Sequence, residues 1–190
     1  MAGQQDVLDY WLNELGEAGW YAGGAALDDA IRARFAPLWA EARQGRLDNW
    51  QITPGGSLAY LILTDQMPRN MFRDQAAAFA TDSLAHAAAN RAILLGWDTL
   101  VPVPQRQFFY LPMMHAENQF DQNRSVAFFA TRMPEDAADH ALHARAHRQV
   151  IRAFGRFPTR NAALGRESSA AERAYLVAGG YRATLQALQV

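Results

Sequence analysis

The amino-acid sequence predicts an all-α protein built from antiparallel helix pairs in a single domain, residues 1–190. Apolar residues recur at spacings of three and four along most of the chain, and we find no stretch with the period-2 alternation of a half-buried strand. Proline and glycine separate the helical stretches by short connections, so successive helices are expected to pack as antiparallel neighbours. The length of 190 residues and the lack of a low-complexity linker fit one domain.

The first two helices are predicted at residues 6–15 and 27–43. Asp6 is a suitable N-cap for the first helix, because its carboxylate can accept a free backbone N–H. Between the two, residues 16–24 hold glycines and aromatic residues and are expected to form a loop.

The next two helices follow strong local start and stop patterns. Thr53 and Pro54 form an N-cap followed by a proline at the first helical position. That helix is expected to end near Met67–Pro68, because proline has no backbone donor and disfavours helix in the residue before it. An alanine-rich helix is predicted from residue 74 to 95, ended by Gly96.

The C-terminal half is predicted to contain an apolar segment and four helices. The long third element is expected to begin at Pro134-Glu135-Asp136, where acids favour the helix dipole, and to end at Gly155. A capping box, Ser169 to Glu172, opens the next helix. The predicted ranges are the apolar segment 105–115 and helices at 118–131, 134–155, from 169 to the Gly179-Gly180 pair, and 181–188.

The composition excludes several classes of chemistry. The chain has no Cys and no Lys, so cysteine metal sites, thiolate catalysis and Schiff-base lysines are ruled out, and no cofactor is predicted. A net charge of −1 argues against a nucleic-acid partner. No apolar run approaches the roughly 20 residues of a membrane span, and the N-terminus does not resemble a signal peptide, so we expect no membrane partner and a cytoplasmic location.

The first candidate site is the segment Asp65 to Arg73. Here a helix is expected to end at Pro68 and to present Arg69 and Asn70 from a loop with a rigid base. Arginine can bind a carboxylate or a phosphate through two parallel hydrogen bonds. Alternatively, Arg69 pairs with an acid or a helix end elsewhere and holds two helices together.

The second and third candidates are histidine segments. His115 and Glu117 form a useful acid–base pair only if the helix breaks between them, because residues two apart do not share a helix face. His140, His143 and His147 recur on one helix, and two of them have the four-residue spacing of metal ligands. The H-E-x-x-H motif is not present, so no metal site is predicted.

The fourth candidate is an arginine cluster. Arg152, Arg156, Arg160 and Arg166 fall within fifteen residues, with Glu167 as the only nearby acid. Clustered guanidinium groups repel one another unless a negative charge lies between them. That charge could come from a bound anion or from the protein itself, with Asp65, Glu117 and Asp121 as candidate partners in an internal salt-bridge clasp.

These residues lie in motifs that resemble the family called domain of unknown function 924. The motifs are Asp65-Gln-x-Pro-Arg-Asn-x-Phe-Arg73, Tyr110-Leu-Pro-x-x-His-x-Glu117 and the long His147-to-Glu167 motif with Phe154-Gly-Arg-Phe-Pro. The resemblance implies a right-handed helical array similar to tetratricopeptide-repeat proteins, and a mostly bacterial, cytosolic distribution. It implies no established activity. The chain departs from the pattern at Met67, Ala116, Asn118 and Thr159, where Phe, Ser, Asp and His are common. Helix pairs of about 34 residues fit a repeat layout, although no repeat is visible in the sequence.

Two functions are predicted as alternatives. The first is a cleft lined by arginine and histidine that binds a small anionic molecule or an acidic peptide end. The predicted ligand-binding residues are Asp65, Arg69, Asn70, Arg156, Arg160, Asn161, Arg166 and Glu167. The second is a small-molecule hydrolase in which His115 or His147 is a general base held by Glu117 or Asp65, and arginines stabilise developing charge. A purely structural or protein-interaction role is the third possibility, and the oligomeric state is not predicted.

Overall fold

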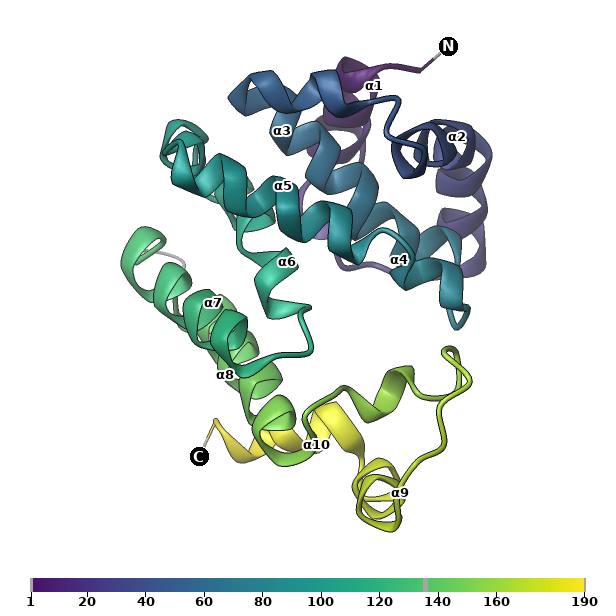
Figure 1. The fold of residues 1–190 in the computed structure, drawn as a ribbon, viewed down its shortest axis with the longest axis vertical. Helices are drawn as coiled ribbons and strands as arrows, with labels where there is room; N and C mark the ends of the chain where they lie inside the picture. Colours follow the sequence, from purple (N-terminus) through teal and green to yellow (C-terminus); the bar gives the residue numbers. More distant parts are fainter. Residues whose placement is uncertain (1, 135–136, 190) are drawn as a thin grey trace. The chain divides into compact units, whose positions relative to one another are not determined.

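The computed structural model describes residues 2–134 and 137–189, and none of these residues lies in a β-strand (Figure 1). The chain divides into two compact units, Met1–Pro112 (unit 1) and Met113–Val190 (unit 2), and each is described here by itself. The all-α class is confirmed. The assignment of both units to one domain stays a prediction. Among the described residues, no helix has the length and apolar character needed to cross a membrane.

Unit 1 begins with the predicted N-terminal helix. It runs as α1 (Gln4–Leu8) and continues as the π-helical segment η1 (Asp9–Leu15). The predicted N-cap is wrong, because the helix starts two residues earlier, after Gly3. Asp6 is instead the third helical residue, and its Oδ2 accepts the N–H of Gly3 at 2.7 Å. This is the acidic half of a capping box.

The second predicted helix is confirmed as α2 (Ala25–Arg43), after the short 3₁₀ turn η2 (Glu17–Gly19). Ile31, Phe35 and Trp39 recur at four-residue spacing and are buried. They form the apolar stripe through which an amphipathic helix packs against its neighbours. Helix α2 contacts α4 (Met67–Met71) and the segment before it, η4 (Ile62–Gln66).

The third helix does not end at Met67–Pro68. After η3 (Asp48–Ile52), α3 (Pro54–Leu61) begins with the predicted Thr53 cap, whose hydroxyl accepts the N–H of Gly56 at 3.1 Å. The chain then continues through the π-helical segment η4 (Ile62–Gln66) into α4 (Met67–Met71). Pro68 lies in the first turn of α4, where a missing donor is tolerated. Arg69 and Asn70 therefore project from a helix and not from a loop.

The alanine-rich helix is shorter than predicted. Residues 74–81 form a bend and the 3₁₀ turn η5 (Ala76–Phe79), and only α5 (Asp82–Leu94) is regular helix, ending before Gly96 as predicted. Asp74 has a φ of +60°, which interrupts helical geometry. Thr81 donates its hydroxyl to the Thr64 carbonyl and accepts the Trp39 indole N–H, so tertiary contacts determine where α5 begins. Helices α3 and α5 lie side by side in Figure 1.

Short helical segments complete unit 1 and connect it to unit 2. They are η6 (Trp97–Leu100), η7 (Gln105–Phe109) and α6 (Leu111–Met114), of which α6 includes the boundary between the units. Phe108, Phe109 and Tyr110 are buried, as expected for the apolar segment.

Unit 2 is built on an antiparallel helix hairpin of α7 (Gln119–Arg132) and α8 (Ala137–Phe154), which lie side by side in Figure 1. Asn118 is the N-cap of α7, and its Oδ1 accepts the N–H of Asp121 at 2.9 Å. The predicted acidic start of α8 at Glu135 and Asp136 lies outside the described residues. Helix α8 ends at Gly155, which has a φ of +71°.

The rest of unit 2 folds back onto α8. It consists of η8 (Pro158–Arg160), α9 (Ala170–Val177) and α10 (Gly180–Ala187). The predicted capping box is confirmed: Ser169 Oγ accepts the N–H of Glu172, and the Glu172 carboxylate accepts the N–H of Ser169. A small core of Val150, Ile151 and Phe157, covered by Phe154 and Tyr175, joins α8 to this segment.

Candidate functional site

In unit 1, Arg69 is held by two carboxylates of the protein. Its Nη2 lies 3.3 Å from Asp65 Oδ1 and 3.1 Å from Asp82 Oδ1, and its Nη1 donates to the Asp65 carbonyl. Burial opposes the charge of the guanidinium, but the two carboxylates outweigh it and raise the pKa of Arg69. These ion pairs support the alternative in which Arg69 holds α4 against α5.

Asn70 belongs to a second cluster in unit 1. Asp28, which is buried on α2, accepts the Asn70 amide at 2.9 Å and the Arg73 guanidinium at 2.7 and 3.0 Å. The hydrogen bond from Arg73 lowers the pKa of Asp28, and burial acts in the opposite direction. The motif around Pro68 therefore ties α4 to α2, and Asp28 is a partner that the sequence interpretation missed.

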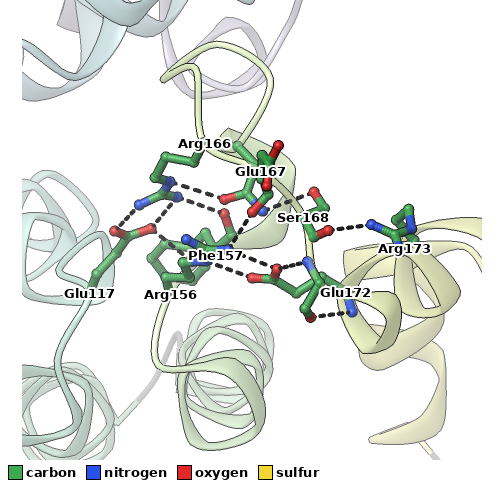
Figure 2. A network of polar contacts seen from close by, with 10 residues as sticks. Glu117, Arg156, Phe157, Arg166, Glu167, Ser168, Glu172 and Arg173 are labelled. Atoms are coloured by element: carbon green, nitrogen blue, oxygen red, sulfur yellow. Dashed lines mark hydrogen bonds and ion pairs between the residues drawn. The ribbon is translucent and has the colours of Figure 1, made fainter.

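In unit 2, Glu117 joins three points of the chain (Figure 2). Its Oε2 accepts Arg166 Nη1 at 2.6 Å, and its Oε1 accepts Arg166 Nη2 at 3.0 Å and the N–H of Phe157 at 2.7 Å. Burial raises the pKa of Glu117, but these hydrogen bonds to the charged form outweigh it, and the net direction is down. Glu117 is thus a structural anchor, and its two oxygens are occupied by Arg166 and Phe157.

Arg156 forms a second ion pair within unit 2 (Figure 2). Its Nε and Nη2 donate to the two carboxylate oxygens of Glu172 at 2.6 and 2.8 Å, and Nη2 also donates to the Glu167 carbonyl at 2.7 Å. The hydrogen bond from Arg156 holds the pKa of Glu172 well below its ordinary value. The sequence identified Glu172 only as part of the capping box, and its ion pair with Arg156 was not predicted.

Asn161 is buried between these two ion pairs. Its Oδ1 accepts Arg166 Nε at 3.0 Å, and its Nδ2 donates to Ser168 Oγ at 3.0 Å. Arg156, Asn161 and Arg166, together with Glu117 and Glu172, therefore form an internal clasp, which was one of the two alternatives for the arginine cluster. Of the three acids considered for that clasp, Glu117 is the one that pairs with Arg166, and Asp121 pairs with Arg124 at 2.9 Å.

Arg160 has different surroundings, because it lines a pocket of about 240 Å³ in unit 2, here called the His147 pocket. Its Nη2 donates to the His115 carbonyl at 3.0 Å, and its guanidinium carbon lies 4.6 Å from the centre of the Phe157 ring. Aromatic rings form much of the remaining wall. The residues lining this pocket are His147, Val150, Phe157, Pro158, Thr159, Arg160, Tyr175 and Tyr181.

His147 reaches the same pocket from α8. Its Nδ1–H donates to the His143 carbonyl at 2.9 Å, which leaves the lone pair of the neutral ring on Nε2. Burial lowers the pKa of His147 to about 3, and the nearby His115, with ring centres 6.1 Å apart, acts in the same direction. The ring is still partly accessible, because it lines the pocket. His147 is therefore a neutral group of fixed tautomer at neutral pH.

The other two histidines of α8 contact aromatic rings. His143 Nδ1 lies 2.6 Å from the Tyr181 hydroxyl, and His140 stacks on Phe129 with ring centres 5.5 Å apart. Within residues 2–134 and 137–189, no group of three potential ligands could hold a metal ion.

Comparison with known proteins places the chain in a family. A sequence model described as "Bacterial protein of unknown function (DUF924)" matches residues 7–180. The chain belongs to this family. The fold is similar to that of ATU0120, a protein of unknown function from Agrobacterium tumefaciens, with a TM-score of 0.84 and 39% sequence identity over 91% of this chain and 96% of that one. No curated protein matches the chain.

Membership of the DUF924 family confirms the resemblance seen in the motifs, and it adds no activity, because the family and the similar structure are both described as of unknown function. The residues that the motifs did not reveal are Tyr175 and Tyr181, which come from α9 and α10 and complete the His147 pocket. Neither tyrosine lies in a recognisable motif. Both reach the pocket because α9 packs against η8 and α10 packs against α8.

Proposed function

We propose that unit 2 binds a small organic anion in the His147 pocket. The observation that carries this proposal is that one cavity brings together the Arg160 guanidinium, several aromatic rings and the neutral imidazole of His147. Ligand pockets in proteins combine mostly apolar walls with a few placed polar groups. A volume of about 240 Å³ suits a compound smaller than a typical drug.

The chemistry of the lining suggests three features of the ligand. A carboxylate or phosphate would bind Arg160, whose planar guanidinium can donate two parallel hydrogen bonds. An apolar or aromatic body would pack against Phe157 and the two tyrosines. A hydroxyl or N–H would donate to His147 Nε2, which has no hydrogen-bond partner within the part of the chain that the structure describes. A hydroxylated aromatic acid has all three features, and an acidic peptide end is a second ligand with a carboxylate.

The geometry favours binding over hydrolysis. A general base works best when its pKa lies near the working pH, and a His147 pKa of about 3 makes the imidazole a weak base at neutral pH. The carboxylate of Glu117, proposed as its orienting partner, is occupied by Arg166 and the Phe157 backbone. The hydrolase alternative therefore has less support than the binding function.

The remaining predicted site residues have a supporting role in this proposal. Arg156, Asn161, Arg166 and Glu117 hold the segment that carries Phe157 and Arg160, and Glu167 contributes its carbonyl. Asp65, Arg69 and Asn70 are engaged within unit 1, and a ligand contact there stays a prediction. The tetratricopeptide-like right-handed array, the cytoplasmic location and the exclusion of nucleic-acid and membrane partners also stay predictions.

Titration with 4-hydroxybenzoate tests the proposal, with the neutral 4-hydroxybenzamide as the matched compound. The acid is expected to shift the ring signals of Tyr175 and Tyr181 in NMR spectra of the full chain. Arg160→Gln is expected to weaken the binding about tenfold or more, because it removes a charge-assisted hydrogen bond. The control is Arg152→Gln, which changes an exposed arginine of α8 outside the pocket.

The proposal is wrong if millimolar 4-hydroxybenzoate leaves the tyrosine signals unchanged, if the benzamide binds as tightly, or if the two arginine variants lose affinity equally. Arg160→Gln also removes the hydrogen bond to the His115 carbonyl, so a loss of binding in that variant has two explanations. Tyr181→Phe is therefore a second variant. It keeps the ring in the pocket wall, and its ring signals must still shift when the acid binds.

A further inference from the structure

A second pocket, of about 240 Å³, lies wholly within unit 1. It is called the Tyr60 pocket here. Three elements form it: η3, α3 and α5. On α5, residues 84, 87 and 91 have the spacing of a single helix face. On η3, whose backbone departs from helical geometry at Gln51, residues 48, 51 and 52 line the same space. The local geometry thus directs these side chains into one space.

The hydroxyl of Tyr60 is the first sign that this pocket takes a ligand. The side chain is 1% exposed, and within residues 2–134 and 137–189 its hydroxyl has no hydrogen-bond partner. The hydroxyl oxygen is not fully enclosed by protein atoms. The small accessible part of Tyr60 is therefore at its hydroxyl, which faces the pocket. Buried tyrosine hydroxyls usually have a partner, so a ligand atom is the natural one here.

Two opposite charges on the rim are the second sign. Asp48 from η3 and Arg91 from α5 both line the pocket, yet they form no ion pair with each other or with another residue of the described chain. Gln51 adds an amide beside Asp48. Both residues are exposed, and an anionic group near Arg91 and a cationic group near Asp48 would pair with both at once.

We propose that the Tyr60 pocket binds a small aliphatic zwitterion of the size of an amino acid. Its carboxylate would accept hydrogen bonds from Arg91 and the Tyr60 hydroxyl, and its ammonium would donate to Asp48 and Gln51. Leu84 and Ile52 supply an apolar wall for a branched side chain. The volume equals that of about eight water molecules, which is enough for such a compound.

The protonation state of Tyr60 is consistent with this role. Burial raises the pKa of the phenol to about 12, and the negative charge of Asp48 acts in the same direction. The hydroxyl therefore keeps its proton at neutral pH and can donate it to a carboxylate. This proposal does not depend on the function proposed for unit 2, because all lining residues belong to unit 1.

Leucine, N-acetyl-leucine and leucinamide are the probes, because the last two each lack one of the two charges. Amide NMR spectra of the full chain are recorded during each titration. We expect leucine to shift signals of η3, α3 and α5, and we expect each derivative to bind at least about tenfold more weakly. Arg91→Ala is expected to weaken leucine binding by a similar factor, and Tyr60→Phe by about two- to tenfold.

One control and one conservative variant separate a site from general effects. Arg145→Ala removes an exposed arginine of unit 2 and is expected to leave leucine affinity unchanged. Tyr60→Phe keeps the ring and removes only an unpaired hydroxyl, so it is expected to fold normally. The proposal is overturned if leucine shifts no signals of unit 1 at millimolar concentration, if either derivative binds equally well, or if Arg91→Ala behaves like Arg145→Ala. Failure here leaves the 4-hydroxybenzoate result intact, since that experiment reads tyrosines of unit 2.

Discussion

Replacing Glu117 by Gln tests whether the internal clasp of unit 2 stabilises the fold. The glutamine amide can still accept the Phe157 N–H, but it presents no charge to Arg166. With its oxygen in place of Oε1, the glutamine puts an NH2 group, which cannot accept, against Arg166 Nη1. The 2.6 Å hydrogen bond is therefore lost, the 3.0 Å bond to Nη2 becomes a neutral one, and the backbone contact stays in place. Arg166 keeps its bonds to Asn161 Oδ1 and the Phe157 carbonyl.

The size of the effect follows from the burial of the pair. Hydrogen bonds to charged groups contribute about 1.5–3 kcal/mol each. The two side chains are 25% and 23% exposed, so water screens part of this interaction. We expect Glu117→Gln to lower the free energy of unfolding by about 2 kcal/mol at neutral pH, which corresponds to a shift in the urea midpoint of about 1 M for a typical slope.

The measurement is urea unfolding followed by helical circular dichroism. All five tryptophans lie between residues 11 and 97, so tryptophan fluorescence reports unit 1 alone and serves as a second probe. A double-mutant cycle with Arg166→Gln isolates the pairwise energy. The matched control is Glu14→Gln, because Glu14 accepts two hydrogen bonds from Arg34 in an exposed pair, for which we expect about 0.5 kcal/mol or less.

The pH dependence supplies a further check. The folded state lowers the pKa of Glu117 below its ordinary value of 4.5, so the stabilisation is complete above that value and is lost as the pH falls through the lowered pKa. The difference between the two proteins must then shrink in acid. The clasp does not stabilise unit 2 if Glu117→Gln costs no more than Glu14→Gln, or if the coupling energy with Arg166→Gln is near zero.

Three other variants and one titration extend these expectations. Asp28→Ala should lower the free energy of unfolding by about 2 kcal/mol, detected by tryptophan fluorescence, because it removes three hydrogen bonds from Asn70 and Arg73. Ser169→Ala should cost about 1 kcal/mol in urea unfolding through loss of the N-cap. Phe129→Ala should cost about 3–5 kcal/mol by the same method, because the ring is fully buried. In an NMR titration His147 should stay neutral far below pH 6.5. Stability should therefore fall with pH from 6.5 towards 3, since only the unfolded chain binds the proton there.

Helix starts were predictable where the deciding chemistry is local. Thr53 with Pro54, and Ser169 with Glu172, place an oxygen three residues before the N–H that it accepts, and both caps are present in the structure. The last turns of α5 and α8 were equally clear, because Gly96 and Gly155 adopt the positive φ that ends a helix. Such patterns need no knowledge of the rest of the chain.

Other features depend on residues distant in sequence and could not be predicted. The beginning of α5 is set by hydrogen bonds that join Thr81 to Trp39 and Thr64, up to 42 residues away. In the candidate site, Glu117 and Arg166 are 49 residues apart. The sequence therefore identified Glu117 only as one of three candidate acidic partners for the arginine cluster. The motifs singled out the arginines, but they could not tell that Arg156 and Arg166 pair with carboxylates of unit 2 while Arg160 lines a pocket.

The π-helical segment between α3 and α4 has a consequence for how Arg69 and Asn70 acquire their partners. The N–H of Met67 donates to the carbonyl of Ile62, five residues earlier, so this turn holds more residues than an α-helical turn. Because each α-helical residue advances the side-chain direction by about 100°, one additional residue changes the direction of everything after it by a similar angle. Shortening this turn by one residue would thus turn the side chains of Arg69 and Asn70 away from Asp82 and Asp28. The contacts that join α4 to α5 and to α2 would be lost.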